Sequence, residues 1–193
     1  FVAGLDGETK KTFDLNVAFL KRLLEEDLWI RRINIRQVRP VRREFEPTGL
    51  YGEFRRFKET VRTAIDHEML RRVVPEGTIL RDVYLELQDG HVTYGRQIGT
   101  YPILVGLPYD MALNRFVDAC VVSHGQRSLT AVEYPLDLNR APLAALSALP
   151  GIGAKRAARI VRARPFDSWP SFAASLDDPA VAERVAPFVG LAG

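Results

Sequence analysis

The stretch of sequence that decides the fold is Leu149-Pro150-Gly151-Ile152-Gly153-Ala154-Lys155-Arg156-Ala157-Ala158. Leucines at helical spacing precede it, whereas proline cannot continue a helix and glycine takes positive φ at little cost. We therefore expect a helix that ends before Pro150, a glycine turn in which Ile152 fills the local core, and a second helix over residues 154–164. The stretch predicts two helices joined by a tight hairpin.

The second helix of this hairpin begins with basic residues. Lys155, Arg159 and Arg162 are spaced so that they lie on one side of the helix. A helix N-terminus offers unpaired N–H groups and the positive end of a dipole, and both suit a phosphate. We expect phosphate contacts from the backbone or side chains of Gly151, Ile152, Gly153, Ala154, Lys155, Arg156, Arg159 and Arg162. The alternative is a hairpin that serves only structure and packs against protein.

Residues 137–172 resemble the helix-hairpin-helix family. The resemblance rests on the two glycines around Ile152, the preceding proline, the alanine-rich second helix and the trailing segment 165–172. It is closest to the repair and DNA-uptake members of that family. It implies that the hairpin amides bind the phosphates of DNA without reading bases.

Composition sets the protein class. The chain has 193 residues, 47% of them hydrophobic and 26% charged, which fits one large globular domain or two to three small ones. No apolar run approaches the length of a membrane span, so we expect no membrane partner. Cys120 is the only cysteine, which excludes a disulfide framework or a cysteine metal site within this chain and favours a cytoplasmic setting. Because the first residue is Phe1, we expect a fragment or a processed product.

The charge is distributed unevenly along the chain. Residues 1–75 hold 16 Lys and Arg against 12 Asp and Glu, residues 76–135 hold 4 against 7, and residues 136–193 hold 7 against 5. The net charges are therefore +4, −3 and +2, which sum to the +3 of the whole chain. Local basic patches, rather than a general positive surface, must carry any binding of nucleic acid.

The N-terminal segment predicts a strand, a helix and a second strand. We expect the strands within residues 1–5 and 30–38 and the helix over residues 9–27, an order that makes the strands parallel. A further helix is expected over residues 51–73. A single unit of this kind cannot bury both faces of its sheet, so it belongs at the edge of a larger structure.

Within this segment, the turn Gly4-Leu5-Asp6-Gly7-Glu8-Thr9 resembles a late barrel strand of radical S-adenosylmethionine (SAM) enzymes, above all the branch with the methylthiotransferases. The resemblance implies that Gly4, Gly7 and Glu8 lie on the SAM side of a parent barrel, whose upstream part is then a partner of this chain. The family's iron–sulfur cluster needs three closely spaced cysteines, and this chain has only Cys120. We therefore expect no cofactor in this chain itself, and SAM and a [4Fe-4S] cluster are implied for the parent protein alone.

The middle of the chain, residues 76–135, predicts a small antiparallel barrel, because five short strand-like runs alternate with glycine or proline turns. The run Tyr94-Gly95-Arg96-Gln97 and residues 117–122 and 125–129 resemble the TRAM domain, an OB-like RNA-binding barrel of tRNA-modifying enzymes. The resemblance implies that Arg96 and Arg127 contact the RNA backbone, and Tyr94 and Tyr101 are candidates for base stacking. The net charge of −3 keeps open a second interpretation, in which the barrel only spaces two domains.

Other candidate residues remain without a specific role. The loop over residues 39–53 carries Arg39, Arg42 and Arg43, which either meet phosphates or form a solvated charge run. The histidines His67, His91 and His124 lie in different expected elements, so no catalytic or metal site is assigned.

The sequence thus predicts an α+β protein in three parts: the edge of a radical-SAM-like α/β barrel at 1–75, an OB-like barrel at 76–135, and an all-α helix-hairpin-helix module at 136–193. The predicted function is that of a DNA- or RNA-binding region of a radical SAM modification or repair enzyme. The alternative is a protein-binding scaffold module without affinity for nucleic acid.

Overall fold

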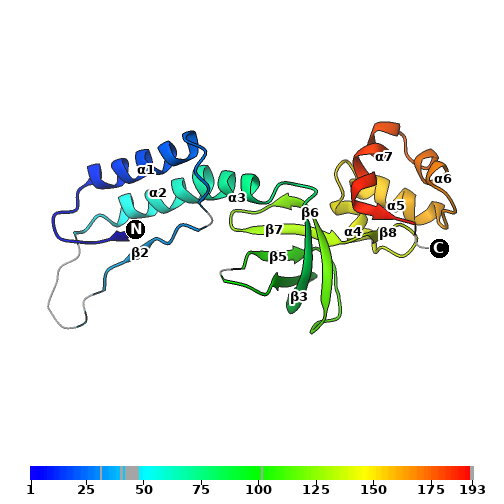
Figure 1. Cartoon of the computed structure of the whole chain (residues 1–193), viewed down its shortest axis with the longest axis horizontal. Coiled ribbons are helices and arrows are strands. Elements are labelled where there is room, and N and C mark those ends of the chain that lie inside the picture. The colour runs from blue at the N-terminus through cyan, green and yellow to red at the C-terminus, as the bar shows by residue number, and fades with distance from the viewer. Residues whose placement is uncertain (31, 40, 42–47, 101, 192–193) are drawn as a thin grey trace. The chain divides into compact units, whose positions relative to one another are not determined.

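A computed structural model describes residues 1–30, 32–39, 41, 48–100 and 102–191. The fold is mixed α+β, as the sequence predicted, and the chain divides into two compact units, residues 1–73 and 74–193 (Figure 1). The closed sheet and the C-terminal helices belong to the same unit. Among the described residues, no helix combines the length and apolar character needed to cross a bilayer. The predicted roles of Arg42, Arg43 and Tyr101 lie outside the described residues.

The first unit contains the predicted strand, helix and strand. Strand β1 (Val2–Ala3) pairs in parallel with β2 (Arg36–Gln37), and helix α1 (Lys10–Glu25) lies between them in sequence. Helix α2 (Tyr51–Thr60) continues through a π-helical turn, η1 (Val61–Asp66), into α3 (His67–Val73). The parallel pairing is confirmed, although both strands are shorter than predicted. The core of this unit consists of Ala3, Phe13, Leu20, Ile33, Phe57, Val61, Ile65 and Met69.

The second unit begins with five strands that pair in a closed order (Figure 1). The strands are β3 (Ile79–Asp89), β4 (Val92–Gln97), β5 (Leu104–Leu107), β6 (Phe116–His124) and β7 (Ser128–Glu133). Their order is β3-β4-β5-β7-β6, and β6 pairs back onto β3. Alternation along the strands buries a common set of apolar side chains, Val83, Leu85, Val105, Leu107, Val121, Leu129 and Ala131.

The prediction of a wholly antiparallel sheet is wrong in one pairing. Strands β5 and β7 run parallel, with Val105 opposite Leu129, while the other four pairings are antiparallel. The cause is that the ring contains an odd number of strands, β3-β4-β5-β7-β6. Strand direction reverses at every antiparallel pairing, so a ring with an odd number of strands cannot close without one parallel pair.

The C-terminal part is helical but not all-α, so the predicted class of that module is wrong. Its helices are α4 (Leu143–Ala148), α5 (Ala154–Ala163), α6 (Trp169–Ala174), α7 (Pro179–Val185) and a 3-10 turn, η2 (Ala186–Phe188). A short parallel pair, β8 (Leu136–Asp137) and β9 (Val189–Gly190), joins its two ends. The Leu138 N–H also donates to the Gly190 carbonyl over 3.0 Å. Backbone groups at the two ends need partners, and each end supplies them to the other.

Candidate functional sites

The glycine turn between α4 and α5 has the shape that the sequence predicted. Gly151 has a φ of +79°, and Ile152 is only 2% exposed, so its side chain anchors the turn in the core. The Ile152 N–H donates to the Leu149 carbonyl over 3.0 Å. Glycine is needed at 151 because its φ lies in the left-handed region, which costs other residues about 1–2 kcal/mol.

Gly153 has a different role. It is the N-cap of α5 with an ordinary φ of −88°, and no side chain caps the helix. A Cβ atom built on Gly153 would meet nothing within 4 Å. The open amides at the start of α5 can therefore be approached closely by a ligand.

Lys155 extends this open face. Its side chain is exposed, and none of the salt bridges resolved among the described residues involves it. A cation beside the positive end of a helix dipole makes a local environment that suits an anion. Gly153, Ala154 and Lys155 therefore form an exposed, positively polarised patch.

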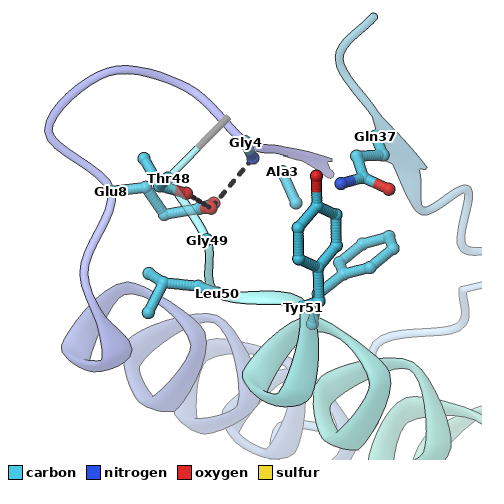
Figure 2. Close-up of a pocket in the computed structure, with 9 residues that line it drawn as sticks. Ala3, Gly4, Glu8, Gln37, Thr48, Gly49, Leu50 and Tyr51 are labelled. Carbon is cyan, nitrogen blue, oxygen red and sulfur yellow. Dashed lines mark hydrogen bonds between the residues drawn. The ribbon is translucent and has the colours of Figure 1, made fainter. Parts of the chain in front are cut away.

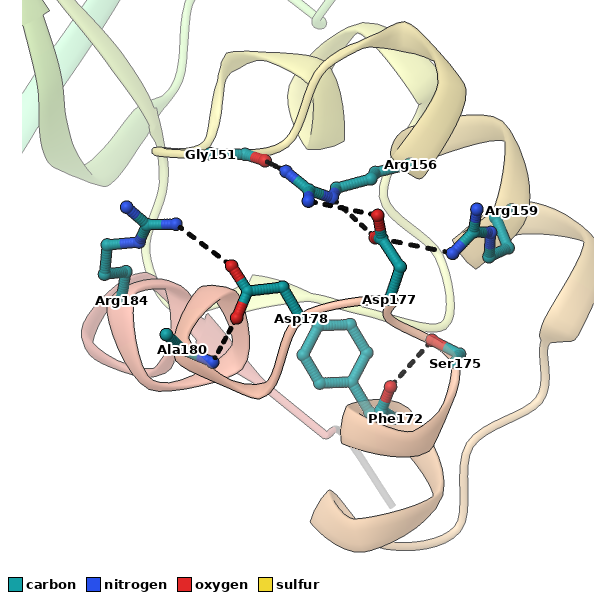
Figure 3. A network of polar contacts seen from close by, with 9 residues as sticks. All are labelled: Gly151, Arg156, Arg159, Phe172, Ser175, Asp177, Asp178, Ala180 and Arg184. Atoms are coloured by element: carbon teal, nitrogen blue, oxygen red, sulfur yellow. Dashed lines mark hydrogen bonds and ion pairs between the residues drawn. The ribbon is translucent and has the colours of Figure 1, made fainter.

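Arg156 faces the protein instead. Its Nε and Nη2 donate to the two carboxylate oxygens of Asp177 over 2.7 and 3.2 Å, and its Nη1 donates to the Gly151 carbonyl over 2.8 Å (Figure 3). The bidentate contact with Arg156 lowers the pKa of Asp177 below its ordinary value, and the same contact raises the pKa of Arg156. Arg156 thus ties the glycine turn to the loop before α7.

The other predicted basic side chains are more exposed to solvent than that of Arg156. Arg159 Nη1 lies 3.4 Å from an Asp177 oxygen with its side chain 46% exposed, and Arg162 is exposed with Nε directed to the Ala158 carbonyl over 3.3 Å. The side chains of Lys155, Arg159 and Arg162 therefore remain on the surface, whereas Arg156 is largely committed to Asp177.

Sequence reasoning missed two residues of this site. Asp177 lies within reach of both Arg156 and Arg159, and Arg184 on α7 approaches the turn, its Nη2 3.2 Å from where a Cβ on Gly151 would lie (Figure 3). The Asp177-Asp178-Pro179 run is an ordinary helix-start pattern, which Asp178 fulfils by accepting from the Ala180 N–H. No local signal shows that Asp177 and Arg184 meet a turn more than twenty residues earlier in the chain.

The predicted residues of the closed sheet lie on β4 and in the loop between β6 and β7. Arg96 on β4 pairs with Glu86 over 2.8 Å, and Arg127 is exposed in the loop between β6 and β7. Tyr94 lies against β5, its ring 3.1 Å from where a Cβ on Gly106 would lie.

The turn Gly4–Thr9 of the first unit brings two of its predicted residues together. The Gly4 N–H donates to Glu8 Oε2 over 2.8 Å, and the Thr48 hydroxyl lies 3.5 Å from the same oxygen (Figure 2). Gly4 and Gly7 have φ of +90° and +77°, which explains glycine at both positions. The cavity here measures about 10 Å³, the room of one water molecule.

This loop does not fit SAM by itself. A cavity of that size cannot hold a nucleoside, and the Glu8 carboxylate already accepts a hydrogen bond from the Gly4 N–H. Cys120 lies in the other unit and is buried, and burial raises the pKa of its thiol to about 11. In the part of the chain that the structure describes, no three His, Cys, Asp or Glu side chains gather in a group able to hold a metal ion.

Comparison with known proteins relates the chain to longer archaeal proteins. No family model matches it. It is 46% identical over 158 residues to an uncharacterized protein of Archaeoglobus fulgidus, a match that covers 78% of this chain and 30% of that protein. It is also 46% identical over 140 residues to an uncharacterized protein of Methanocaldococcus jannaschii, covering 66% of this chain and 25% of that protein. The chain therefore spans less than a third of the length of either relative.

Proposed function

We propose that this chain is the nucleic-acid-binding region of a larger enzyme that modifies or repairs nucleic acid. The observation that carries the proposal is the open start of α5. No side chain caps this helix, Gly153 leaves free space in front of its amides, and Lys155 is exposed beside them.

The chemistry of binding follows from that geometry. Phosphate oxygens accept hydrogen bonds from the free N–H groups of the first turn, and Lys155 adds a positive charge at the same place. Arg159 and Arg162 extend the contact along the helix. Every nucleotide carries the same phosphate, so the hairpin binds without base preference, as helix-hairpin-helix modules do.

Arg156 acts as a positioning residue in this proposal. It holds the Gly151 carbonyl and Asp177 together, and so fixes the turn from the inner side. A preorganised turn does not have to be ordered when a phosphate binds, which favours affinity.

The closed sheet supports an OB-like, TRAM-like domain as part of the same function. A five-stranded Greek-key barrel of the OB type binds oligonucleotides with its second and third strands and with the loops after its first and fourth strands. In this chain the second strand carries Arg96, and the loop after the fourth strand carries Arg127. We propose that these residues guide a nucleic acid that the hairpin holds.

The parent protein is proposed to be a cytoplasmic radical SAM enzyme. The turn from Gly4 to Thr9 resembles that family, and the archaeal relatives are three to four times longer than the matched segment. The small cavity beside Glu8 means that this unit would supply at most one wall of a SAM site. When bound, SAM and its cluster would supply radical chemistry, and the upstream part of the barrel would hold them.

A salt titration tests the proposal. The whole chain is titrated with duplex DNA, single-stranded DNA and structured RNA at several salt concentrations, because phosphate binding must weaken as salt rises. Lys155→Ala should lower the slope of log affinity against log salt by about one. Lys11→Ala, which removes one exposed charge from α1 in the other unit, should leave the slope unchanged.

Gly153→Ser separates binding from folding. Serine is a good N-cap, so the fold should be kept or slightly stabilised, whereas its hydroxyl would occupy the amides that a phosphate needs. We expect weaker binding of all three nucleic acids. If the wild type shows no salt-sensitive binding, or if Lys155→Ala and Arg159→Ala together change nothing, the protein-binding scaffold becomes the better interpretation.

A further inference from the structure

An aromatic pair lies on the outer face of the closed sheet. Tyr84 on β3 and Phe116 on β6 are cross-strand partners, with ring centroids 5.1 Å apart and ring planes at 52°. Phe116 is 52% exposed. The pair therefore presents aromatic surface to solvent on a rigid strand rather than on a loop.

The Tyr84 ring is fixed in place. Its hydroxyl donates to Asn114 Oδ1 over 3.1 Å, and the Asn114 N–H donates to the Leu85 carbonyl over 2.8 Å. Asn114 has a φ of +59°, an uncommon conformation that costs free energy. Asn114 thus holds the half-buried Tyr84 ring beside the exposed Phe116 ring.

The aromatic surface continues along the sheet. Arg96 is the partner of Tyr84 on the other side, and in the next row Tyr94 pairs with Leu87, which is 55% exposed. Tyr94 also pairs with Gly106, where the lack of a side chain leaves room for its ring. A flat ligand can therefore lie across β6, β3 and β4.

The charges around this surface are already balanced. Arg96 pairs with Glu86, Arg115 with Glu133 and Arg81 with Asp118. The three pairs add no net charge, and an exposed pair is worth only about 0–1 kcal/mol, so Arg96 can still exchange Glu86 for a phosphate. The surface suits an uncharged, flat group, and the part of a nucleic acid that matches this description is the base.

We propose that Tyr84 and Phe116 form a stacking site for unpaired bases of a single-stranded nucleic acid. The inference rests on the proposed nucleic-acid-binding function but uses a different surface from the hairpin. Bases within a duplex are already stacked on their neighbours, so only a single strand can use the site. Stacking of one base on an aromatic side chain is worth about 1–3 kcal/mol.

The test compares Phe116→Ala with the wild-type chain in binding a short oligothymidylate and an abasic oligonucleotide of the same length. Phe116→Ala should weaken oligothymidylate binding about tenfold, since 1.4 kcal/mol corresponds to a factor of ten. The factor should be the same at low and high salt, because no phosphate contact is lost. Phe116→Leu keeps apolar volume without the aromatic face, so it should show the same loss and covers the case in which Phe116→Ala folds poorly.

The matched control is Ile98→Ala, which removes an apolar side chain that is 83% exposed just after β4. It should bind oligothymidylate like the wild type. Duplex binding should be unaffected by Phe116→Ala and should still depend on Lys155.

The inference is overturned if Phe116→Ala and Phe116→Leu bind oligothymidylate normally, or if the abasic strand binds as tightly as oligothymidylate. It is also overturned if the chain self-associates through Phe116, which would make the surface a protein interface. Duplex binding that still depends on Lys155 would then leave the proposed function standing.

Discussion

At the scale of single residues, Gly151 and Gly153 lie two positions apart but serve different purposes. Gly151 is required by its φ of +79° and by the Arg184 guanidinium packed beside it. Gly153 has ordinary backbone angles and open space, so nothing in the fold itself requires glycine there. A glycine without a structural requirement fits close approach by a ligand.

This difference predicts opposite effects on stability. Gly151→Ala should lower the free energy of unfolding by about 1–2 kcal/mol, because alanine at positive φ is strained. Gly153→Ser should leave it unchanged or slightly higher. Urea unfolding of both variants followed by circular dichroism checks the prediction. Equal losses in both would mean that the turn needs glycine at each position.

Asp177 predicts a pH dependence. Its pKa is lowered mainly by the hydrogen bonds from Arg156, so its ionised form stabilises the folded state. A depressed pKa contributes stability above the unfolded value of about 4, and this stability is lost as pH falls through the folded pKa. We expect the thermal midpoint of the wild type to fall between about pH 5 and pH 2, and Asp177→Asn to fall less steeply over that range. Identical acid profiles for the two proteins would show that the pair contributes nothing.

At the scale of elements, hydrophobic periodicity and turn residues were sufficient to predict most helices and strands. Helix α5 begins at Ala154 as predicted, and the second unit contains the five strands expected within residues 76–135. The parallel pairing of β5 and β7 was missed. The spacing of strand-like runs and turns predicts where strands lie but not which strands become neighbours. The β8–β9 pair was missed because two residues form no pattern.

The pairing of β3 with β4 depends on one glycine. A Cβ on Gly95 would lie 2.6 Å from the Tyr84 carbonyl oxygen, which belongs to backbone and cannot rotate away. Gly95→Ala should therefore destabilise the second unit by about 1–3 kcal/mol. Gly99→Ala is the matched control, because nothing lies within 4 Å of its Cβ position. Chemical denaturation measures both, and a neutral Gly95→Ala would contradict the strand geometry.

At the scale of the whole molecule, the candidate site could be predicted only in part. The sequence indicated the turn and the basic helix after it, because the two are adjacent in the sequence. It did not indicate that Asp177 engages Arg156, since that contact joins residues 21 positions apart and carries no local pattern. The sequence thus indicated the local chemistry of the turn. It did not indicate which basic side chains form ion pairs within the protein and which remain exposed.

The two units differ in how much stability each can have alone. The first unit has one pair of two-residue strands, and Val2, Leu5 and Trp29 are 52% exposed or more. A sheet of two strands is marginal without further packing, so this unit should gain stability from the rest of a longer protein. The second unit has a closed sheet and a helical core with Phe172 and Ile160 fully buried.

We expect a fragment of residues 74–193 to unfold in a single cooperative calorimetric transition and to bind duplex DNA with the salt slope of the whole chain. The fragment of residues 1–73 should melt broadly and bind no duplex. If the 74–193 fragment loses the salt-dependent binding while remaining folded, phosphate contacts must come from the basic first unit, and the hairpin proposal fails.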